Sequence, residues 1–372
     1  MTRPLDIVVL GLSLSSSWGN GHATTFRALL RGVDGAGHKV TFLERDMPWY
    51  ASRRDLAEPG FCKLLLYGSV DELMSLHGQR LAGADAIVIG SYVPDGVELI
   101  DAVADLAPKR LCFYDIDTPV TLSKLRRGEE EYLARRQVPY FDVYFSFSGG
   151  KILDRLRDEF GARRACPLYC AVDLERYRNT GAKRTWDLGY LGTYSPDRQP
   201  TLERLLLEPA RQLPEMRFVV AGPSYPASTV WPENVERVEH LPPSEHADFY
   251  SRQRFTLNVT RADMIAAGWS PSVRLFEAAA CRTPLISDWW EGIGHFFPPG
   301  EAAIIAHSSV DVVRALTGVS ERRRRAIAAT AYDRVASAHS AEARARSFID
   351  TIESVAPKTD LAPRRCERRL PA

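Results

Sequence analysis

The sequence predicts an α/β protein with two domains, each containing a mainly parallel β-sheet. Short apolar runs rich in β-branched residues alternate with stretches of helical periodicity along the chain, which is the pattern of parallel sheets. The chain has 372 residues, of which 45% are hydrophobic. This is enough for two domains of ordinary size, each with its own core.

The overall charge argues against two classes of partner. Lys and Arg total 48 against 47 for Asp and Glu, a net charge of +1, whereas a general nucleic-acid or membrane-surface binder carries a strong positive excess. The first apolar run, 6–12, is too short for a signal peptide or a membrane span. We therefore expect a cytoplasmic protein with a small-molecule partner and no membrane span. The sequence does not indicate its oligomeric state.

The six cysteines predict reduced thiols. None has the C-x-x-C spacing of a zinc site. The alternative is that Cys166 and Cys170, the closest pair, form a disulfide or half of a metal site. No His or Cys cluster completes such a metal site.

The chain opens as strand, loop and helix, over 6–12 and about 23–33. The loop lacks the G-x-G-x-x-G fingerprint, which argues against a nicotinamide dehydrogenase. Its Gly19 and Gly21 permit close backbone approach by a ligand. His22 lies where the helix begins, either as a surface or capping residue or as a group beside a ligand.

Further strands and helices follow in the first half. Strands are predicted over 37–46, 85–90, 110–114 and 141–150, and helices over 97–106, 121–137 and 151–160. Asp115 and Asp117 follow one of these strands at its carboxyl end, where open α/β sheets bind ligands. Asp117 is a candidate base or hydroxyl ligand, and the alternative is an N-cap or turn role before Thr-Pro.

The second half repeats the alternation. Strands are predicted over 186–194, 217–223, 235–241, 255–260 and 283–288, and the last helices over 321–337 and 341–355. The segment 357–372 is Pro-rich and charged, and we expect it to be disordered.

The segment 268–288 carries the strongest chemical signal. A helix is predicted with Ser270 as N-cap and Pro271 as its first residue, ending near Cys281. At about 100° per residue, Ser270, Arg274 and Glu277 share a polar stripe. The helix start and Arg274 suit an anion, whereas Glu277, about 9–10 Å along the axis, suits neutral hydroxyls. A ligand with a phosphate next to several hydroxyls would fit both groups, and a nucleotide sugar is such a ligand. The alternative is an ordinary amphipathic helix with a surface ion pair.

The run 258–288, with NVTR, SPSVRLFEAAA and TPLISD, resembles the C-terminal segment of the CgeB-like glycosyltransferases, relatives of the retaining family 4 type. SSSWGNGHATTFRALLRG and FLERDMPWY resemble the N-terminal half of the same family. The resemblance implies the GT-B fold, with two Rossmann-like domains facing a central cleft. It implies transfer of a sugar from a nucleotide-diphosphate sugar to an unidentified acceptor, without a metal or another cofactor.

The resemblance also suggests the domain limits. Val172, Asp173 and Tyr177 resemble the turn that leads from the first GT-B domain to the second. We therefore expect an acceptor-side domain over 1–178 and a nucleotide-sugar domain over 179–340. A C-terminal helix over 341–356 is expected to cross back onto the first domain.

The resemblance suggests three groups of site residues. The donor-binding candidates are Gly192, Thr193, Arg198, Ser270, Ser272, Arg274 and Glu277. The acceptor-side candidates are Trp18, Gly19, Gly21, Arg45 and Asp46. The catalytic candidates are Asp117, His22 and Arg274. For Arg198 the alternative is an exposed arginine in a turn.

One departure from the family pattern affects the stereochemistry. Many retaining GT-B enzymes carry two glutamates eight positions apart, and here Trp269 stands at the first position while Glu277 matches the second. The resemblance therefore implies that Glu277 contacts the ribose of the donor. It does not imply that the reaction retains the anomeric configuration. A sugar-nucleotide epimerase of the same fold and a non-catalytic nucleotide-sugar-binding protein are the alternatives. Asp115 and Asp117 formally match D-x-D, but they lie in a first-domain loop and no metal is expected there.

Overall fold

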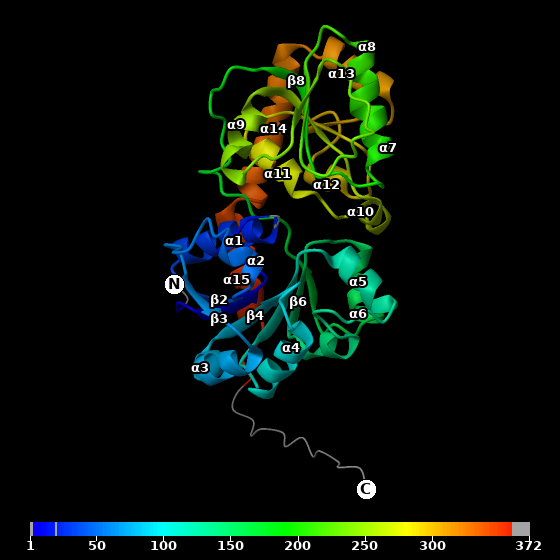
Figure 1. Ribbon diagram of the computed structural model, residues 1–372. Helices are drawn as coiled ribbons and strands as arrows, with labels where there is room; N and C mark the ends of the chain where they lie inside the picture. The colour runs from blue at the N-terminus through cyan, green and yellow to red at the C-terminus, as the bar shows by residue number, and fades with distance from the viewer. Residues whose placement is uncertain (1–2, 19–20, 359–372) are drawn as a thin grey trace. The chain divides into compact units, whose positions relative to one another are not determined.

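The computed structural model describes residues 3–18 and 21–358, which form two compact units (Figure 1). The first unit comprises the chain up to Phe147, Leu153–Leu168 and the segment from Ala345 onward. The second comprises Ser148–Ile152 and Tyr169–Arg344. Each unit contains one sheet whose paired strands are all parallel. This confirms the predicted α/β class with two Rossmann-like units.

The sheet of the first unit has the strand order β3-β2-β1-β4-β5-β6-β7. Its strands are β1 Asp6–Gly11, β2 Lys39–Arg45, β3 Lys63–Tyr67, β4 Ala86–Gly90, β5 Leu111–Asp115, β6 Val143–Ser146 and β7 Ala165–Pro167. The chain adds strands outward from β1 in one direction and from β4 in the other. In such sheets the ligand crevice lies outside the carboxyl ends of the two central strands, at the topological switch point.

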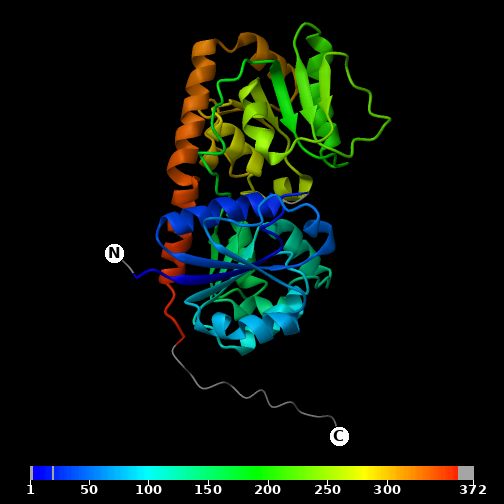
Figure 2. The same cartoon turned by 60° about the vertical axis from the view of Figure 1, so that its left-hand side comes forward.

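Helices cover both faces of this sheet, with α1 on one face and α3 and α4 on the other (Figure 2). The helices are α1 Gly21–Gly35, α2 Pro48–Ala51, α3 Val70–Gly83, α4 Gly96–Asp105, α5 Thr118–Arg126, the 3₁₀ helix η1 Arg135–Tyr140, α6 Lys151–Asp158 and α15 Ala341–Glu353. Phe348 of α15 packs on Phe145 of β6, with ring centroids 5.2 Å apart. The prediction of one helix over 121–137 was wrong, because Gly128 adopts a left-handed conformation at φ 75° and the chain leaves the helix there.

The sheet of the second unit has the order β10-β9-β8-β11-β12-β13, so its switch point lies between β8 and β11. Its strands are β8 Trp186–Leu191, β9 Phe218–Ala221, β10 Val235–Val238, β11 Gln253–Asn258, β12 Leu285–Ser287 and β13 Ala303–Ile305. The five strands predicted in this half are confirmed. The short strand β13 was not predicted.

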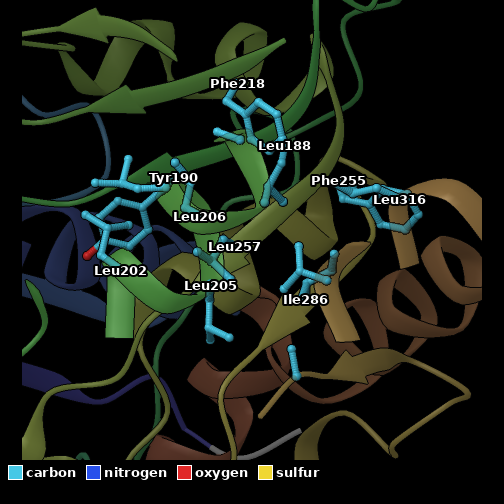
Figure 3. Packing of buried hydrophobic residues seen from close by; sticks show 14 of the residues in the cluster. Leu188, Tyr190, Leu202, Leu205, Leu206, Phe218, Phe255, Leu257, Ile286 and Leu316 are labelled. Atoms are coloured by element: carbon cyan, nitrogen blue, oxygen red, sulfur yellow. The ribbon is translucent and has the colours of Figure 1, made fainter. Parts of the chain in front are cut away.

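The helices of the second unit enclose a leucine-rich core (Figure 3). They are α7 Gln199–Leu202, the π-helical turn η2 Glu203–Leu207, α8 Glu208–Gln212, the 3₁₀ helix η3 Pro243–Glu245, α9 His246–Ser251, α10 Ala262–Ala267, α11 Val273–Ala280, α12 Ile293–Phe296, α13 Ser309–Gly318 and α14 Glu321–Ala338. Leu205, Leu206 and Leu257 are fully buried between sheet and helices. This core fixes the strand ends on which the candidate site is built. Over the described residues, no helix combines the length and apolar character needed to cross a bilayer.

Candidate functional site

Arg274 of α11 lies across the ends of the two central strands of the second unit. Its Nε donates to the carbonyl of Leu191, at the end of β8, and its Nη1 donates to Oδ1 of Asn258, at the end of β11, over 3.2 Å. The guanidinium also stands 5.0 Å from the ring centroid of Tyr190. Arg274 is therefore held at the switch point, where a ligand of this fold is expected.

Arg198 adds a second guanidinium beside the first. It is only 8% exposed, and its Nη2 donates to the carbonyl of Thr193 over 2.5 Å. Burial lowers its pKa, as does the nearby charge of Arg274. Its Nε has no hydrogen-bond partner in the described part of the chain, and neither guanidinium forms an ion pair with a carboxylate there. The alternative of an exposed arginine in a turn is wrong.

Two glycines let the loops after β8 and β9 approach closely. A Cβ on Gly192 would lie 2.5 Å from the hydroxyl oxygen of Tyr190 and 2.9 Å from Nη2 of Arg274. Gly222 has φ +136°, and a Cβ there would lie 2.2 Å from the carbonyl oxygen of Gly192. Both loops therefore meet through main-chain atoms, which only glycine allows. The Tyr225 hydroxyl donates to the same carbonyl over 3.1 Å.

The start of α11 differs from the prediction. The helix begins at Val273 with Ser272 as N-cap, two residues after the predicted start. Ser270 is buried and its hydroxyl pairs with that of Ser148, so it is held outside the helix, and Trp269 before it has φ 49°. The hydroxyl of Ser272 accepts a hydrogen bond from Nη1 of Arg274 over 3.2 Å.

Glu277 lies one turn further along α11 and is 6% exposed. The hydroxyl of Tyr250 donates to its Oε2 over 3.2 Å, and Nδ1 of His246 lies 3.7 Å from the same oxygen. Burial alone would raise the pKa of Glu277, but His246 and the neighbouring tyrosine hydroxyls lower it below its usual value. Among the described residues Glu277 forms no ion pair with Arg274, so the alternative of a surface pair is wrong.

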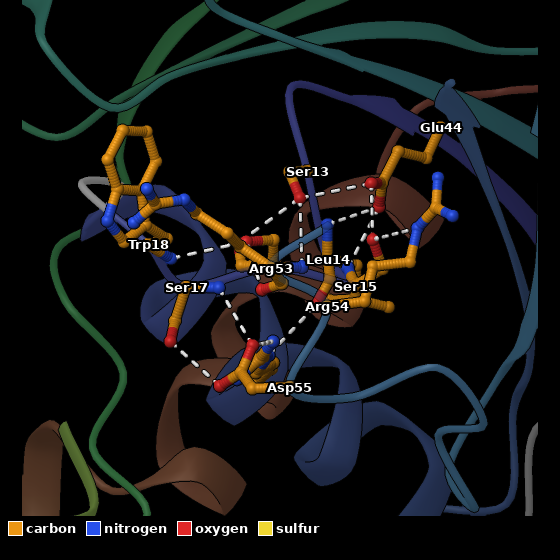
Figure 4. Close-up of polar contacts among 11 residues, drawn as sticks. Ser13, Leu14, Ser15, Ser17, Trp18, Glu44, Arg53, Arg54 and Asp55 are labelled. Atoms are coloured by element: carbon orange, nitrogen blue, oxygen red, sulfur yellow. Dashed lines mark hydrogen bonds and ion pairs between the residues drawn. The ribbon is translucent and has the colours of Figure 1, made fainter. Parts of the chain in front are cut away.

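In the first unit, a buried carboxylate shapes the loop that follows β1 (Figure 4). Glu44 of β2 has no exposed surface and accepts hydrogen bonds from the N–H groups of Leu14 at 2.6 Å and Ser15 at 2.9 Å. The hydroxyls of Ser13 and Ser15 donate to its other oxygen. The sequence analysis missed Glu44, although a charged residue inside an apolar strand is a readable signal.

The same loop presents Trp18, which is 44% exposed. Asp55 holds the preceding residue, because its carboxylate accepts from the N–H and the hydroxyl of Ser17 at 2.9 and 2.8 Å. The guanidinium of Arg53 lies 3.9 Å from the ring centroid of Trp18. The indole is thus an accessible aromatic surface on an anchored loop.

The catalytic candidates His22 and Asp117 both contact Tyr92, which the sequence analysis missed. The Tyr92 hydroxyl donates to Oδ2 of Asp117 over 3.2 Å, and its ring meets the His22 ring edge-on at 5.2 Å. Burial lowers the pKa of His22 to about 4, so its imidazole is neutral at pH 7. Gly21 begins α1 with open space around it, and Gly19 lies outside the described residues.

The backbone of Tyr92 is strained, since its φ of 62° is in the left-handed region that aromatic residues rarely adopt. Tyr92 directly follows Ser91, at the carboxyl end of β4 and therefore at the switch point of the first unit. Strain of this kind costs of order 1–3 kcal/mol and is found mainly at functional sites. No local sequence pattern marks the residue.

Three other predicted residues of the first unit, Asp115, Arg45 and Asp46, form hydrogen bonds or ion pairs with neighbouring side chains. Asp115 is fully buried and accepts from the hydroxyls of Tyr144 at 2.7 Å and Thr121 at 2.8 Å, and burial raises its pKa to about 6. Arg45 forms an ion pair with Asp95, and Asp46 with Arg54. Within residues 3–18 and 21–358, no group of three or more His, Cys, Asp and Glu is placed to hold a metal ion, and the five described cysteines are free thiols.

The chain is similar to known glycosyltransferases in sequence over part of its length and in fold over nearly all of it. Residues 198–350 match a family described as glycosyl transferase-like. Sucrose-phosphate synthase from Thermosynechococcus elongatus aligns with TM-score 0.67 and 13% identity, over 95% of this chain and 99% of that one. HepE from Anabaena, in complex with UDP and glucose, aligns with TM-score 0.67 and 11% identity, over 94% and 100%.

The β-glucosyltransferase of phage T4, in complex with its substrate UDP-glucose, aligns with TM-score 0.58 and 10% identity, over 94% of this chain and all of that one. No curated protein matches the chain in sequence. The chain therefore has the GT-B fold of two Rossmann-like units, and most of its second unit matches the glycosyl transferase-like family.

Proposed function

We propose that this protein is a glycosyltransferase of the CgeB-like type, which moves a sugar from a nucleoside-diphosphate sugar to an acceptor not yet identified. The observation that carries the proposal is the pair Arg198 and Arg274 at the switch point of the second unit. Two guanidiniums are brought together there, one of them buried, and no carboxylate pairs with either in the described chain.

Asp197 and Asp288 interact with these arginines electrostatically but are not within ion-pair distance of them, so an anion that contacts both guanidiniums would stabilise the pair. Burying a charge without a counter-charge costs several kcal/mol, and two like charges add repulsion. A diphosphate supplies two negative groups whose oxygens match the planar donors of arginine. The Anabaena and phage T4 structures contain UDP-glucose, and the matched family covers both arginines, which supports a nucleoside-diphosphate sugar as that anion.

The chemistry follows from where charge develops. The bond between the anomeric carbon and the diphosphate oxygen breaks, and its electron pair stays on the diphosphate. A new bond forms to the acceptor oxygen, whose proton passes to a base. Arg198 and Arg274 stabilise the negative charge on the leaving diphosphate, and no metal takes part in this step. Asp117 and His22 are the proposed candidates for the base.

The other candidate residues have the following proposed roles. Gly192 and Thr193 bring main chain to the phosphates, and Ser270 and Ser272 shape the entry to α11. Glu277 binds the ribose. Trp18, Gly19, Gly21, Arg45 and Asp46 serve the acceptor side. We further propose that the protein works in the cytoplasm.

A nucleotide-binding panel tests the proposal. UDP, ADP, GDP, CDP and dTDP would be titrated calorimetrically against the full chain, with Arg198→Gln and Arg274→Gln as matched variants. At least one nucleotide should bind the wild type, and each substitution should weaken it about tenfold or more, because a charge-assisted contact is lost.

Donor turnover separates the rival reactions. Release of a nucleoside diphosphate from its sugar in the presence of EDTA supports metal-free transfer. Conversion of the donor to an isomeric sugar nucleotide without any acceptor would favour an epimerase. Failure of every nucleotide to bind would overturn the proposal.

A further inference from the structure

The carboxylate of Glu277 is surrounded by three side chains from separate parts of the second unit. Tyr250 and His246 come from α9, and Tyr177 comes from the segment that follows β7. The hydroxyl of Tyr177 lies 3.5 Å from Nδ1 of His246, and burial and the nearby charge of Glu277 both raise the pKa of Tyr177. These four residues form one polar cluster.

The burial of the cluster makes its geometry rigid. Tyr177 is 2% exposed and Tyr250 is fully buried, so neither hydroxyl can turn to water for a partner. The ring of Tyr177 lies 6.3 Å from that of His246, and the ring of Tyr250 lies 6.4 Å from it. A buried carboxylate needs such donors, because leaving it without them would cost several kcal/mol.

The position of Tyr177 is set by the turn that the sequence analysis treated as a domain connection. The carboxylate of Asp173 accepts from the N–H groups of Glu175 at 3.0 Å and Arg176 at 3.2 Å, which closes the turn. The N–H of Tyr177 donates to the carbonyl of Asp173 over 2.8 Å. Val172 at the start of the turn is paired with Ser340. The turn therefore brings the Tyr177 hydroxyl to His246, beside Glu277, from a distant part of the sequence.

We infer that Tyr177, Tyr250 and His246 are positioning residues, which hold the Glu277 carboxylate in the orientation that its proposed contact with the donor ribose requires. The inference rests on the proposed function, since it deepens the donor site described there. Donors on one side of a carboxylate fix its orientation, so that it discriminates between a ligand with two neighbouring hydroxyls and one lacking a hydroxyl.

The test measures ribose discrimination rather than affinity alone. Three proteins would be titrated: the wild type, Tyr177→Phe and Glu277→Gln. The ligands would be UDP, ADP and GDP, the 2′-deoxy form of each, and inorganic pyrophosphate. Tyr332→Phe is the matched control in the same unit, because Tyr332 packs under the guanidinium of Arg282 at 3.7 Å and is not part of the cluster. Melting temperatures would be recorded for all four proteins, and Tyr250→Phe replaces Tyr177→Phe if the latter does not fold.

The wild type should prefer a ribonucleotide over its 2′-deoxy form by about tenfold or more, because a buried acceptor would otherwise lose its partner. Tyr177→Phe should reduce that preference severalfold and Glu277→Gln should abolish it, while pyrophosphate affinity stays within about twofold. The control should keep the full preference. If Tyr177→Phe retains the wild-type preference, the positioning role is wrong although the donor site stands. If no nucleotide binds the wild type, the proposed function fails first and the inference falls with it.

Discussion

The two switch points of this molecule have opposite chemistry, although both sheets are parallel and wound in the same way. At the ends of β8 and β11 the second unit gathers cationic Arg198 and Arg274 beside glycine loops. At the ends of β1 and β4 the first unit gathers an imidazole, a phenol and, from the neighbouring strand β5, carboxylates. The same scaffold therefore places two cationic side chains at one switch point and groups that can accept a proton at the other.

This difference teaches that the fold supplies the location and the side chains supply the reaction. In the proposed donor site of the second unit, the charge is fixed before a ligand arrives. The first unit holds groups whose protonation can change, since burial sets the pKa of Asp115 at about 6 and that of His22 at about 4. The comparison predicts that substitutions in the second unit alter donor affinity, whereas those in the first alter turnover.

Asp117→Asn should show the largest effect if the first unit supplies the base. The amide cannot take the proton, so donor turnover should fall about 10²–10⁴-fold while nucleotide affinity stays unchanged. Turnover would be followed as nucleoside diphosphate released, and affinity by calorimetry. An equal loss in both measurements would contradict the division between the units.

Arg274→Ala should lower turnover about 10²-fold or more, because the arginine faces charge that develops on the leaving diphosphate. Nucleotide affinity should also fall, unlike in Asp117→Asn. Arg282→Ala is a matched control, because Arg282 lies two residues beyond the end of the same helix and packs on Tyr332. An unchanged rate in Arg274→Ala would make Arg274 structural.

Tyr92→Phe should lower turnover by roughly tenfold or less, because it removes only the hydroxyl that donates to Asp117. The ring contact with His22 and the left-handed backbone remain. The pH profile should shift toward higher pH, since a carboxylate that loses a donor becomes a stronger base. A profile that does not move would show that Tyr92 serves packing alone.

Asp115→Asn should stabilise the protein at pH 7 by of order 1–3 kcal/mol. Burial raises the pKa of Asp115 to about 6, against about 3.9 in an unfolded chain, so the wild type loses stability as pH rises between these values. The variant should lack this loss. Urea denaturation at pH 4.5 and pH 7 measures it, and a variant less stable than the wild type at pH 7 would contradict the prediction.

His339 of the second unit should respond to pH in the opposite direction to Asp115, because its pKa is lowered rather than raised. Burial lowers the pKa of His339 to about 2, so its neutral ring stabilises the fold above about pH 6.5 and this contribution is lost as the pH falls. His339 packs on Phe276 with ring centroids 4.4 Å apart. His339→Phe should weaken the dependence of the melting temperature on pH between 6.5 and 5. An unchanged slope would rule out this residue as its source.

The sequence predicted five of the six strands of the second unit and five of the seven of the first, because buried parallel strands read as short apolar runs between helices. It missed β3, β7 and β13, each of which is short or partly exposed. The start of α11 was predicted two residues early, since Ser270 has the residue type of a cap but is engaged by Ser148. That partner is far away in the sequence and invisible to local rules.

Arg274 and Glu277 were identified from spacing and resemblance, yet their surroundings were not predictable. The residues around Glu277 come from α9 and from the turn at 172–177, and Tyr92 and Asp117 follow two different strands, β4 and β5. Such contacts depend on tertiary packing, which single-sequence patterns do not encode. Glu44 is different, because its charge inside an apolar strand could have been noticed.

The touching loops after β8 and β9 limit how this protein can be redesigned. Any side chain added at Gly222 would strike the carbonyl oxygen of Gly192, so Gly222 offers no room for a new specificity. A side chain added at Gly192 would meet the Tyr190 hydroxyl and the Arg274 guanidinium. An engineer who wishes to change the accepted donor must instead vary the rim, for instance Tyr225, whose hydroxyl bonds that carbonyl. The close contact between the loops after β8 and β9 is thus the part of the candidate site that is hardest to change by substitution.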